Sequence, residues 1–211
     1  MAMLVAALAS CAAATADPLR IVLSSPLVEE GSEPDGCTPV ASGDGGPIAW
    51  VVRVERLLLD GKALVETSGG REPNRFPMCV ADRPVACNLE VELAFVPRQG
   101  HVARAAGIVL RLLDASDYYL VRADALANDV RMVRVLNGEH VEVAARAVPI
   151  AAGTAHVLKV RAADDHFTVW LEGRRLFDAS ERRLMTPGRI GIWSQSDSVT
   201  SFGDLFVTNL D

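Results

Sequence analysis

The feature that most constrains this chain is strict alternation of apolar and polar residues in short segments. From Asn88 to Val96 the sequence reads NLEVELAFV, which places Leu89 and Phe95 on the same side. A period of two residues is typical of a β-strand with one buried face. Asn137-Gly138 lies between two further segments of this kind. Because both residues tolerate positive φ, the pair predicts a tight β-hairpin.

Turn residues separate about a dozen such segments after residue 47, and none has the period of a helix. We expect strands over Ile48–Val54, Ala63–Glu66, Asn88–Val96, Ala105–Leu113, Tyr118–Ala123, Asp129–Leu136, His140–Arg146, Ala155–Arg161, Phe167–Leu171, Arg174–Phe177, Arg189–Ser194 and Phe202–Thr208. Several carry apolar residues on both faces. The sequence therefore predicts an all-β fold of two curved antiparallel sheets, packed as a sandwich with a groove on one outer face.

Composition limits the class of protein. The chain has 211 residues, 50% of them hydrophobic and 23% charged, which suits one large globular domain. Its formal net charge of −6 gives no electrostatic basis for binding nucleic acid. We expect a β-sandwich domain over residues 48–211, and a Gly/Pro-rich arm or linker over residues 17–47.

Residues 1–16 resemble an export signal, because Met3 to Ala9 form an apolar run too short to span a bilayer. Two processing sites are alternatives. A lipobox-like Leu8-Ala9-Ser10-Cys11 would end a lipoprotein leader at residue 10 and leave a lipidated Cys11 as a membrane tether. Ala14-Thr15-Ala16 would instead release a soluble chain. Either route predicts a secreted, periplasmic or envelope-anchored protein.

Export would permit disulfides, and three cysteines follow the leader. Cys37, Cys79 and Cys87 predict one disulfide and one free thiol. The spacing leaves the pairing open.

From Leu89 to the C-terminus the chain resembles the concanavalin A-like lectin/glucanase superfamily, and more narrowly the 3-keto-disaccharide hydrolase domain family and its laminin-G-like relatives. The resemblance covers somewhat more than half of the chain. It is carried by the runs RAAGIVLRLLDASDYYLVRADALANDVRMVRVLNG, AHVLKVRAADDHFTVWLEGRRLF and GRIGIWSQSDSVTSFGDLFV. It implies a jelly-roll sandwich, but not one activity, because the superfamily includes lectins, hydrolases, lyases and adhesion modules.

Catalytic carboxylates of the glucanase kind are missing from the sequence. Glycosidic hydrolysis ordinarily uses two carboxyl groups at a fixed separation, and the glucanase branch carries them as E-x-D-x-x-E on one strand. Glu90 and Glu92 share a face but lack the third acid, so we expect them to face solvent. The sequence therefore favours a binding module over an enzyme.

Arginine and aromatic residues in the strands are the candidate ligand contacts, since guanidinium groups can donate several hydrogen bonds to sugar hydroxyls and aromatic rings can stack on sugars. The predicted ligand-binding residues are Arg111, Tyr119, Arg122, Arg131, Trp193 and Gln195. Two alternatives remain open. In the first, the arginines, together with Arg134, pair with Asp114, Asp117, Asp124 and Asp129 and only hold the sheet together. In the second, Trp193 fills the core of the sandwich instead of lining a groove.

The resemblance also makes Asp204 a candidate ligand for a structural calcium ion, because the superfamily often carries an acid on its last strand. No other cofactor is implied. The leading hypothesis is an extracytoplasmic carbohydrate-binding or adhesion-type module whose partner is a glycan or small saccharide. The alternatives are a glycoside hydrolase-like enzyme acting on a modified (3-keto) disaccharide, and a structural sandwich that binds another protein.

Overall fold

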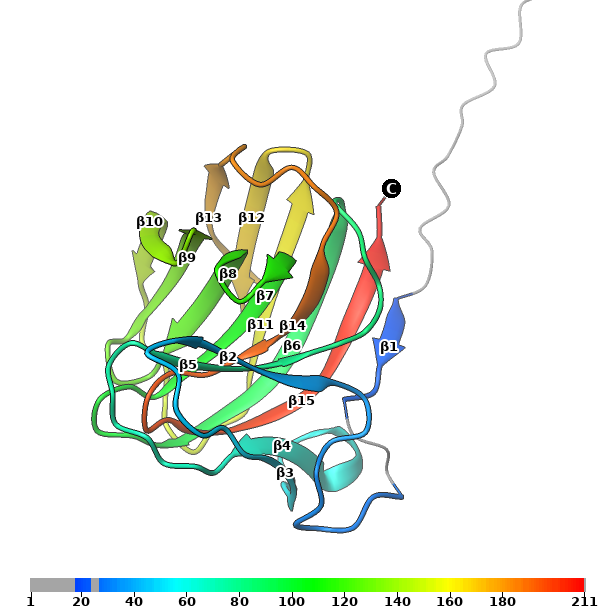
Figure 1. Ribbon diagram of the computed structural model, residues 1–211, viewed down its shortest axis with the longest axis vertical. Coiled ribbons are helices and arrows are strands. Elements are labelled where there is room, and N and C mark those ends of the chain that lie inside the picture. Colours follow the sequence, from blue (N-terminus) through cyan, green and yellow to red (C-terminus); the bar gives the residue numbers. More distant parts are fainter. Residues whose placement is uncertain (1–17, 24–26, 211) are drawn as a thin grey trace, which may run out of the picture.

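Two antiparallel β-sheets pack face to face in the computed structural model, which describes residues 18–23 and 27–210 (Figure 1). In spatial order, sheet A contains β13 (Arg174–Ser180), β12 (His166–Leu171), β11 (His156–Ala163), β6 (Leu89–Gln99), β15 (Val199–Asn209), β4 (Lys62–Glu66) and β3 (Trp50–Val54), with β1 (Leu19–Ile21) also paired to β15. Sheet B contains β10 (Glu139–Ala147), β9 (Asp129–Leu136), β8 (Asp117–Asp124), β7 (Ala105–Asp114), β14 (Arg189–Trp193), β5 (Arg75–Val80) and β2 (Thr38–Gly43). The described residues include one short 3₁₀ turn, Leu59–Gly61, and no α-helix. The all-β, two-sheet prediction is confirmed.

The main core lies between the sheets and follows from the alternation. On β6 the predicted inward residues, Leu89 to Phe95 at every second position, are buried. They pack into one apolar cluster with inward residues of sheet B such as Ile108 and Val121. Burying a side chain of this size stabilises the fold by about 1.5–3 kcal/mol.

The predicted Asn-Gly hairpin is also confirmed. Asn137 and Gly138 have φ angles of 52° and 77° and connect β9 to β10 in antiparallel register. Positive φ at both central residues matches the right-handed twist of the flanking strands. The turn therefore fixes which residues of β9 and β10 lie opposite each other.

The segment expected to be an arm is largely built into the sandwich. β1 adds to the outside of β15, and β2 pairs with β5 along its whole length (Figure 1). Between them, Leu23 is only 1% exposed. Polar composition suggested a linker, but backbone pairing at two sheet edges and one buried leucine order this segment.

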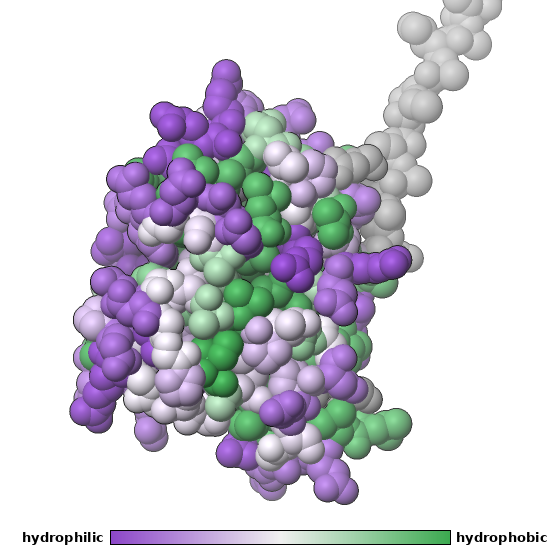
Figure 2. All heavy atoms as spheres, viewed as in Figure 1, coloured by the Kyte–Doolittle hydropathy of each residue, from purple (hydrophilic) through white to green (hydrophobic). Residues whose placement is uncertain are grey.

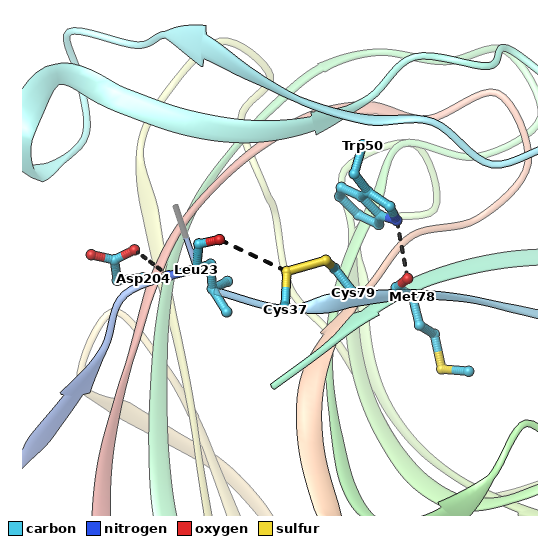
Figure 3. Close-up of a disulfide and its surroundings, with 6 residues drawn as sticks. All are labelled: Leu23, Cys37, Trp50, Met78, Cys79 and Asp204. Atoms are coloured by element: carbon cyan, nitrogen blue, oxygen red, sulfur yellow. Dashed lines mark hydrogen bonds between the residues drawn. A yellow bond between two sulfur atoms is a disulfide. The ribbon is translucent and has the colours of Figure 1, made fainter. Parts of the chain in front are cut away.

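A disulfide joins Cys37 to Cys79 and settles the pairing that the sequence left open, so Cys87 is the free thiol. The bond links the residue before β2 to an inward-facing residue of β5. Cys37 Sγ lies 3.9 Å from the carbonyl oxygen of Leu23, and Trp50 of sheet A donates its indole N–H to Met78 O at 3.0 Å (Figure 3). The disulfide thus sits where both sheets and the N-terminal segment meet.

The export signal, its lipobox and Cys11 lie outside the described residues. Within the described part of the chain, no helix has the length and apolar character needed to cross a membrane.

Acid should weaken the fold partly through Asp197. Its carboxylate accepts the backbone N–H groups of His101 (3.0 Å) and Val102 (2.9 Å). Burial alone would raise the pKa of Asp197, but these backbone hydrogen bonds outweigh burial and lower the pKa below its ordinary value of 3.8. A depressed pKa stabilises the fold fully above the ordinary value, and this contribution is lost as the pH falls through the folded-state pKa.

We therefore expect D197N to be less stable than the wild type at neutral pH and to lose less stability on acidification. Urea unfolding at a series of pH values from about 7 down to about 2 measures this difference. Equal loss of stability in both proteins over that range would contradict the assigned role.

Candidate functional site

Sheet B curls so strongly that strands far apart in it touch across its outer face. Ser42 on β2 donates to Ala115 O at 2.6 Å and lies 3.2 Å from the Tyr118 hydroxyl on β8. Phe76 on β5 packs against His140 on β10, with ring centroids 4.5 Å apart. The sequence predicted a groove on one outer face, and on the outer face of sheet B these contacts cover a buried apolar cluster.

Trp193 fills this curl. It is 1% exposed, its ring stacks on Phe76 at 5.5 Å, and it belongs to an apolar cluster on the outer side of sheet B. Its indole N–H lies beside Tyr118 but makes no hydrogen bond of good geometry. Trp193 therefore neither lines an open groove nor packs between the sheets.

Arg111 and Tyr119 lie on the opposite side of sheet B, facing sheet A. Arg111 is 1% exposed and donates to the carbonyl oxygens of Cys87 and Leu184, both at 3.0 Å, as well as to Asp164 O. The Tyr119 hydroxyl accepts the N–H of Leu184 at 2.9 Å. The guanidinium also lies over the rings of Tyr119 and Phe167, at 5.9 and 5.3 Å. These two predicted site residues hold loops together inside the molecule.

Arg122 and Arg131, by contrast, lie together on the outer face of sheet B. They form a row of charges across β8, β9 and β10 that we call the ionic ladder; its members are Arg122, Asp124, Asp129, Arg131 and Glu142. Arg131 binds Asp129 at 2.6 Å and Glu142 at 2.9 Å. Arg122 approaches Asp124 at 3.2 Å and Asp129 at 3.5 Å. The two arginines thus pair with acids, as the structural alternative expected, and only the pair of Arg131 and Glu142 is substantially exposed.

The ladder keeps unused hydrogen-bonding capacity. The side chains of Arg131 and Glu142 are 39% and 50% exposed. Asp129 Oδ1 also lacks a partner of hydrogen-bonding geometry among the described residues, but it is buried and out of reach of a ligand. A guanidinium has five N–H groups and a carboxylate has about four lone-pair directions, so the exposed Arg131 and Glu142 can bind further polar groups. Figure 2 shows hydrophilic groups over the left edge of the view, where β9 and β10 lie in Figure 1.

Hydrogen bonds favour the charged form of Arg131 and fix the position of Asp124. Those that Arg131 donates to Asp129 raise the pKa of the guanidinium, although burial opposes the change. Asp124 also accepts the backbone N–H groups of Leu126 (2.8 Å) and Arg104 (3.2 Å), so the next turn fixes its position. The ladder is therefore a rigid set of donors and acceptors.

His140 and Glu142 were missed by the sequence reasoning. Alternation in EHVEV places both on one face, and the hairpin register sets them opposite Val135 and Val133. His140 is exposed and covers Phe76, and burial of part of its ring lowers its pKa. Counting outward from Asn137-Gly138 would have found both residues.

The remaining predicted residues lie elsewhere. Gln195, just after β14, donates its side-chain N–H to Pro73 O at 2.9 Å. Asp204 accepts a hydrogen bond from Arg20 at 2.7 Å. It also accepts the N–H of Leu23 at 3.0 Å (Figure 3), and together these contacts anchor the segment around β1. Over residues 18–23 and 27–210, no group of three or more His, Cys, Asp and Glu side chains could hold a metal ion. Calcium at Asp204 stays a prediction.

No family model matches the chain, and no curated protein matches its sequence. Among solved structures, the chain is similar to the carbohydrate binding module CBM66 from Bacillus subtilis, with a TM-score of 0.65 and 20% identity over 83% of this chain and 98% of that one. It is also similar to a protein of unknown function with a galectin-like fold from Bacillus subtilis (TM-score 0.60, 12% identity, 92% and 97% of the two chains). A third is domain 4 of AbnA, a GH43 extracellular arabinanase from Geobacillus stearothermophilus, in complex with arabinotriose (TM-score 0.58, 11% identity, 92% and 94%).

The similarity extends over nearly the whole length of each of these three proteins. It shows that this chain has the jelly-roll sandwich fold of galectins and carbohydrate-binding modules, as the predicted concanavalin A-like class required. At these sequence identities, the comparison shows the fold but does not identify a ligand. The ligand has to be inferred from the residues of the site.

Proposed function

We propose that this chain is an extracytoplasmic carbohydrate-binding module that binds a short, uncharged saccharide at the ionic ladder. The observation that carries the proposal is a fixed row of alternating guanidinium and carboxylate groups that ends in the exposed side chains of Arg131 and Glu142 at the sheet edge. The other three members are largely buried and hold these two in place. Two of the similar structures support the ligand class, since one is a carbohydrate binding module and another is complexed with arabinotriose.

The chemistry of the ladder fits vicinal hydroxyl groups. Each sugar hydroxyl can donate to a carboxylate and accept from a guanidinium, so a mixed row satisfies both roles at once. Arg122 and Arg131 are opposed by three acids, which gives the ladder a net charge of −1. This excess of negative charge would repel an anionic saccharide but not a neutral one.

The size of the ligand follows from the curl of sheet B. Trp193, Phe76 and their apolar neighbours occupy the rest of the outer face, which leaves the β8–β10 end for binding. His140, exposed at the boundary of that cluster, would offer a ring face to the sugar. We therefore expect recognition of one to three sugar units.

The disulfide supports the extracytoplasmic part of the proposal. Disulfides persist in oxidising compartments and are rare in the cytosol. Lipidation at Cys11, cleavage after Ala16 and the resulting location remain proposals.

The hydrolase alternative has less support. Glu90 and Glu92, the two acids placed together by the sequence, both bind Lys159, at 2.5 and 3.0 Å. Because both carboxylates pair with the same ammonium group, their surroundings do not distinguish one as a general acid and the other as a nucleophile. The narrower relation to 3-keto-disaccharide hydrolase domains therefore stays a hypothesis.

Replacing Arg131 with glutamine should weaken saccharide binding about 10- to 100-fold, because a hydrogen bond to a charged group contributes roughly 1.5–3 kcal/mol. The measurement is binding of wild type and R131Q to immobilised neutral mono- to tetrasaccharides, including arabinotriose, with uronic acid-containing oligosaccharides for comparison. R146Q is the matched control, because Arg146 is an exposed arginine on the neighbouring strand β10 and lies opposite Val130, which faces the core. Equal binding by R131Q and wild type, or a preference for the uronic acids, would contradict the proposal.

A further inference from the structure

The outer face of sheet A carries two complete rows of side chains across five strands. Register places one member of each row on β15, β6, β11, β12 and β13 in turn. The first row is Phe206, Glu92, Lys159, Trp170 and Arg175, and the second is Thr208, Glu90, Arg161, Thr168 and Asp178. We call these ten residues the sheet A platform.

The platform is open, unlike the outer face of sheet B. Every one of its side chains is exposed or half-buried, while the residues that alternate with them, such as Val91, Val160 and Val169, are fully buried in the core. No described strand crosses over it in the manner of β2 and β5. Its aromatic rings are therefore accessible where Trp193 is not.

Contacts within the platform hold its side chains in place. Lys159 bridges Glu90 and Glu92, and its ammonium lies 5.6 Å from the centroid of the Trp170 ring. Thr168 donates to Asp178 at 2.9 Å, and Arg175 also binds Asp178. Ordering these groups before a ligand arrives reduces the entropy that binding must overcome.

The charges of the platform cancel. Three acids, Glu90, Glu92 and Asp178, face three bases, Lys159, Arg161 and Arg175. A neutral surface with many donors and acceptors suits an uncharged, hydroxyl-rich ligand and offers no advantage to a polyanion.

Two aromatic rings and a cavity define the direction of a ligand. Trp170 and Phe206 lie in the same row three strands apart, which corresponds to about 14 Å at the usual strand spacing. At the Phe206 end, a cavity of about 110 Å³ is lined by Pro18, Glu90, Glu92, Phe206 and Thr208. A ligand that reaches both rings must run across the strands over several sugar units.

We propose that the sheet A platform is a second saccharide-binding site, and that it binds an extended, neutral polysaccharide chain. Trp170 and Phe206 provide stacking surfaces, and the intervening charged residues bind hydroxyl groups. This inference rests on the proposed function only for its class of ligand, a saccharide. The binding surface is a separate one, on the opposite face of the sandwich. One chain would thus hold a short saccharide on sheet B and a polymer on sheet A.

The test is sedimentation with insoluble neutral polysaccharides, namely microcrystalline cellulose, arabinan and chitin, beside titration with soluble arabinotriose. We expect W170A to lower affinity for the bound polymer about three- to tenfold while leaving arabinotriose binding unchanged. E92Q, at a half-exposed position, tests the same face without removing a large ring, and should also weaken polymer binding. R131Q should show the reverse pattern, with arabinotriose binding weakened about 10- to 100-fold and polymer binding kept.

Three outcomes would overturn the proposal. Wild-type affinity for polymer in both W170A and E92Q would exclude the platform. Binding of soluble saccharides without binding of any polymer would remove the second site and leave the ladder standing. Loss of polymer binding in R131Q equal to that in W170A would show a single site. Thermal unfolding of each variant separates loss of the surface from loss of the fold.

Discussion

Replacing Arg75 with methionine should lower the free energy of unfolding by about 3–5 kcal/mol, the usual cost of breaking a buried ion pair by removing one partner. Arg75 and Glu66 are 1% and 3% exposed, and they join β5 of sheet B to β4 of sheet A at 2.9 Å. Arg75 also donates to Ser196 O at 2.9 Å and Pro47 O at 2.8 Å. The variant leaves a carboxylate and two carbonyl groups without these partners.

The double variant R75M/E66Q separates the two parts of this cost. It removes both charges together, so it should be more stable than R75M alone, because no buried carboxylate lacks its cation. Glutamine can still accept the backbone N–H groups of Ala49 and Ser68, which Glu66 binds at 3.1 Å each. Chemical denaturation of the wild type and the variants measures the effect. A loss below about 1 kcal/mol in R75M would contradict the assigned role of the pair.

Removing the disulfide should cost about 4 kcal/mol. Cys37 and Cys79 are 42 residues apart, and closing a loop of that length restricts the unfolded chain by roughly this amount in the chain-entropy model. For a chain of this size, each kcal/mol shifts Tm by about 2–4 °C, so C37A/C79A should melt roughly 8–16 °C lower.

C87S is the matched control for this prediction. Cys87 is the free thiol, and its Sγ donates to Met185 O, a contact that a serine hydroxyl can imitate. We expect C87S to have a melting temperature close to that of the wild type. We expect C37A/C79A to melt at the same temperature as wild-type protein whose disulfide has been reduced. Equal melting temperatures of C37A/C79A and oxidised wild type would show that the disulfide contributes little.

Local sequence patterns predicted most of the strands after residue 88, because each is amphipathic or ends at a turn. The alternation in NLEVELAFV fixed the buried face of β6, and Asn137-Gly138 fixed the β9–β10 hairpin. Both depend only on neighbours in the chain. The fold class followed from many such local signals.

Strands β1, β2 and β5 were not predicted, for physical reasons that differ. β5 is buried along its whole length and contains Pro77, so it shows neither alternation nor the usual strand composition. β1 has only three residues, and β2 lies in a Gly/Pro-rich stretch that a disulfide and an edge pairing hold in place. Long-range contacts, rather than local preference, order these segments.

The candidate site was predictable only in part. Arg122 and Arg131 were found because charges within strands need a solvated face, and the structure brings them together. The burial of Arg111 was not foreseeable, because it depends on a left-handed backbone (φ 48°) and carbonyl groups from three distant loops. Trp193 is buried because sheet B curls and brings β2 and β5 across its outer face. The curvature of a sheet cannot be predicted from a local sequence pattern.

The most direct test of saccharide binding at the ionic ladder is a titration of ¹⁵N-labelled protein with arabinotriose and with the other neutral oligosaccharides of the panel, followed by NMR. The account predicts that the backbone amide signals that move belong to the outer-facing residues of β8, β9 and β10, with Arg122, Arg131 and Glu142 among them. Spectra unchanged by every neutral saccharide, or changes confined to residues away from the ladder, including changes on the sheet A platform alone, would contradict it.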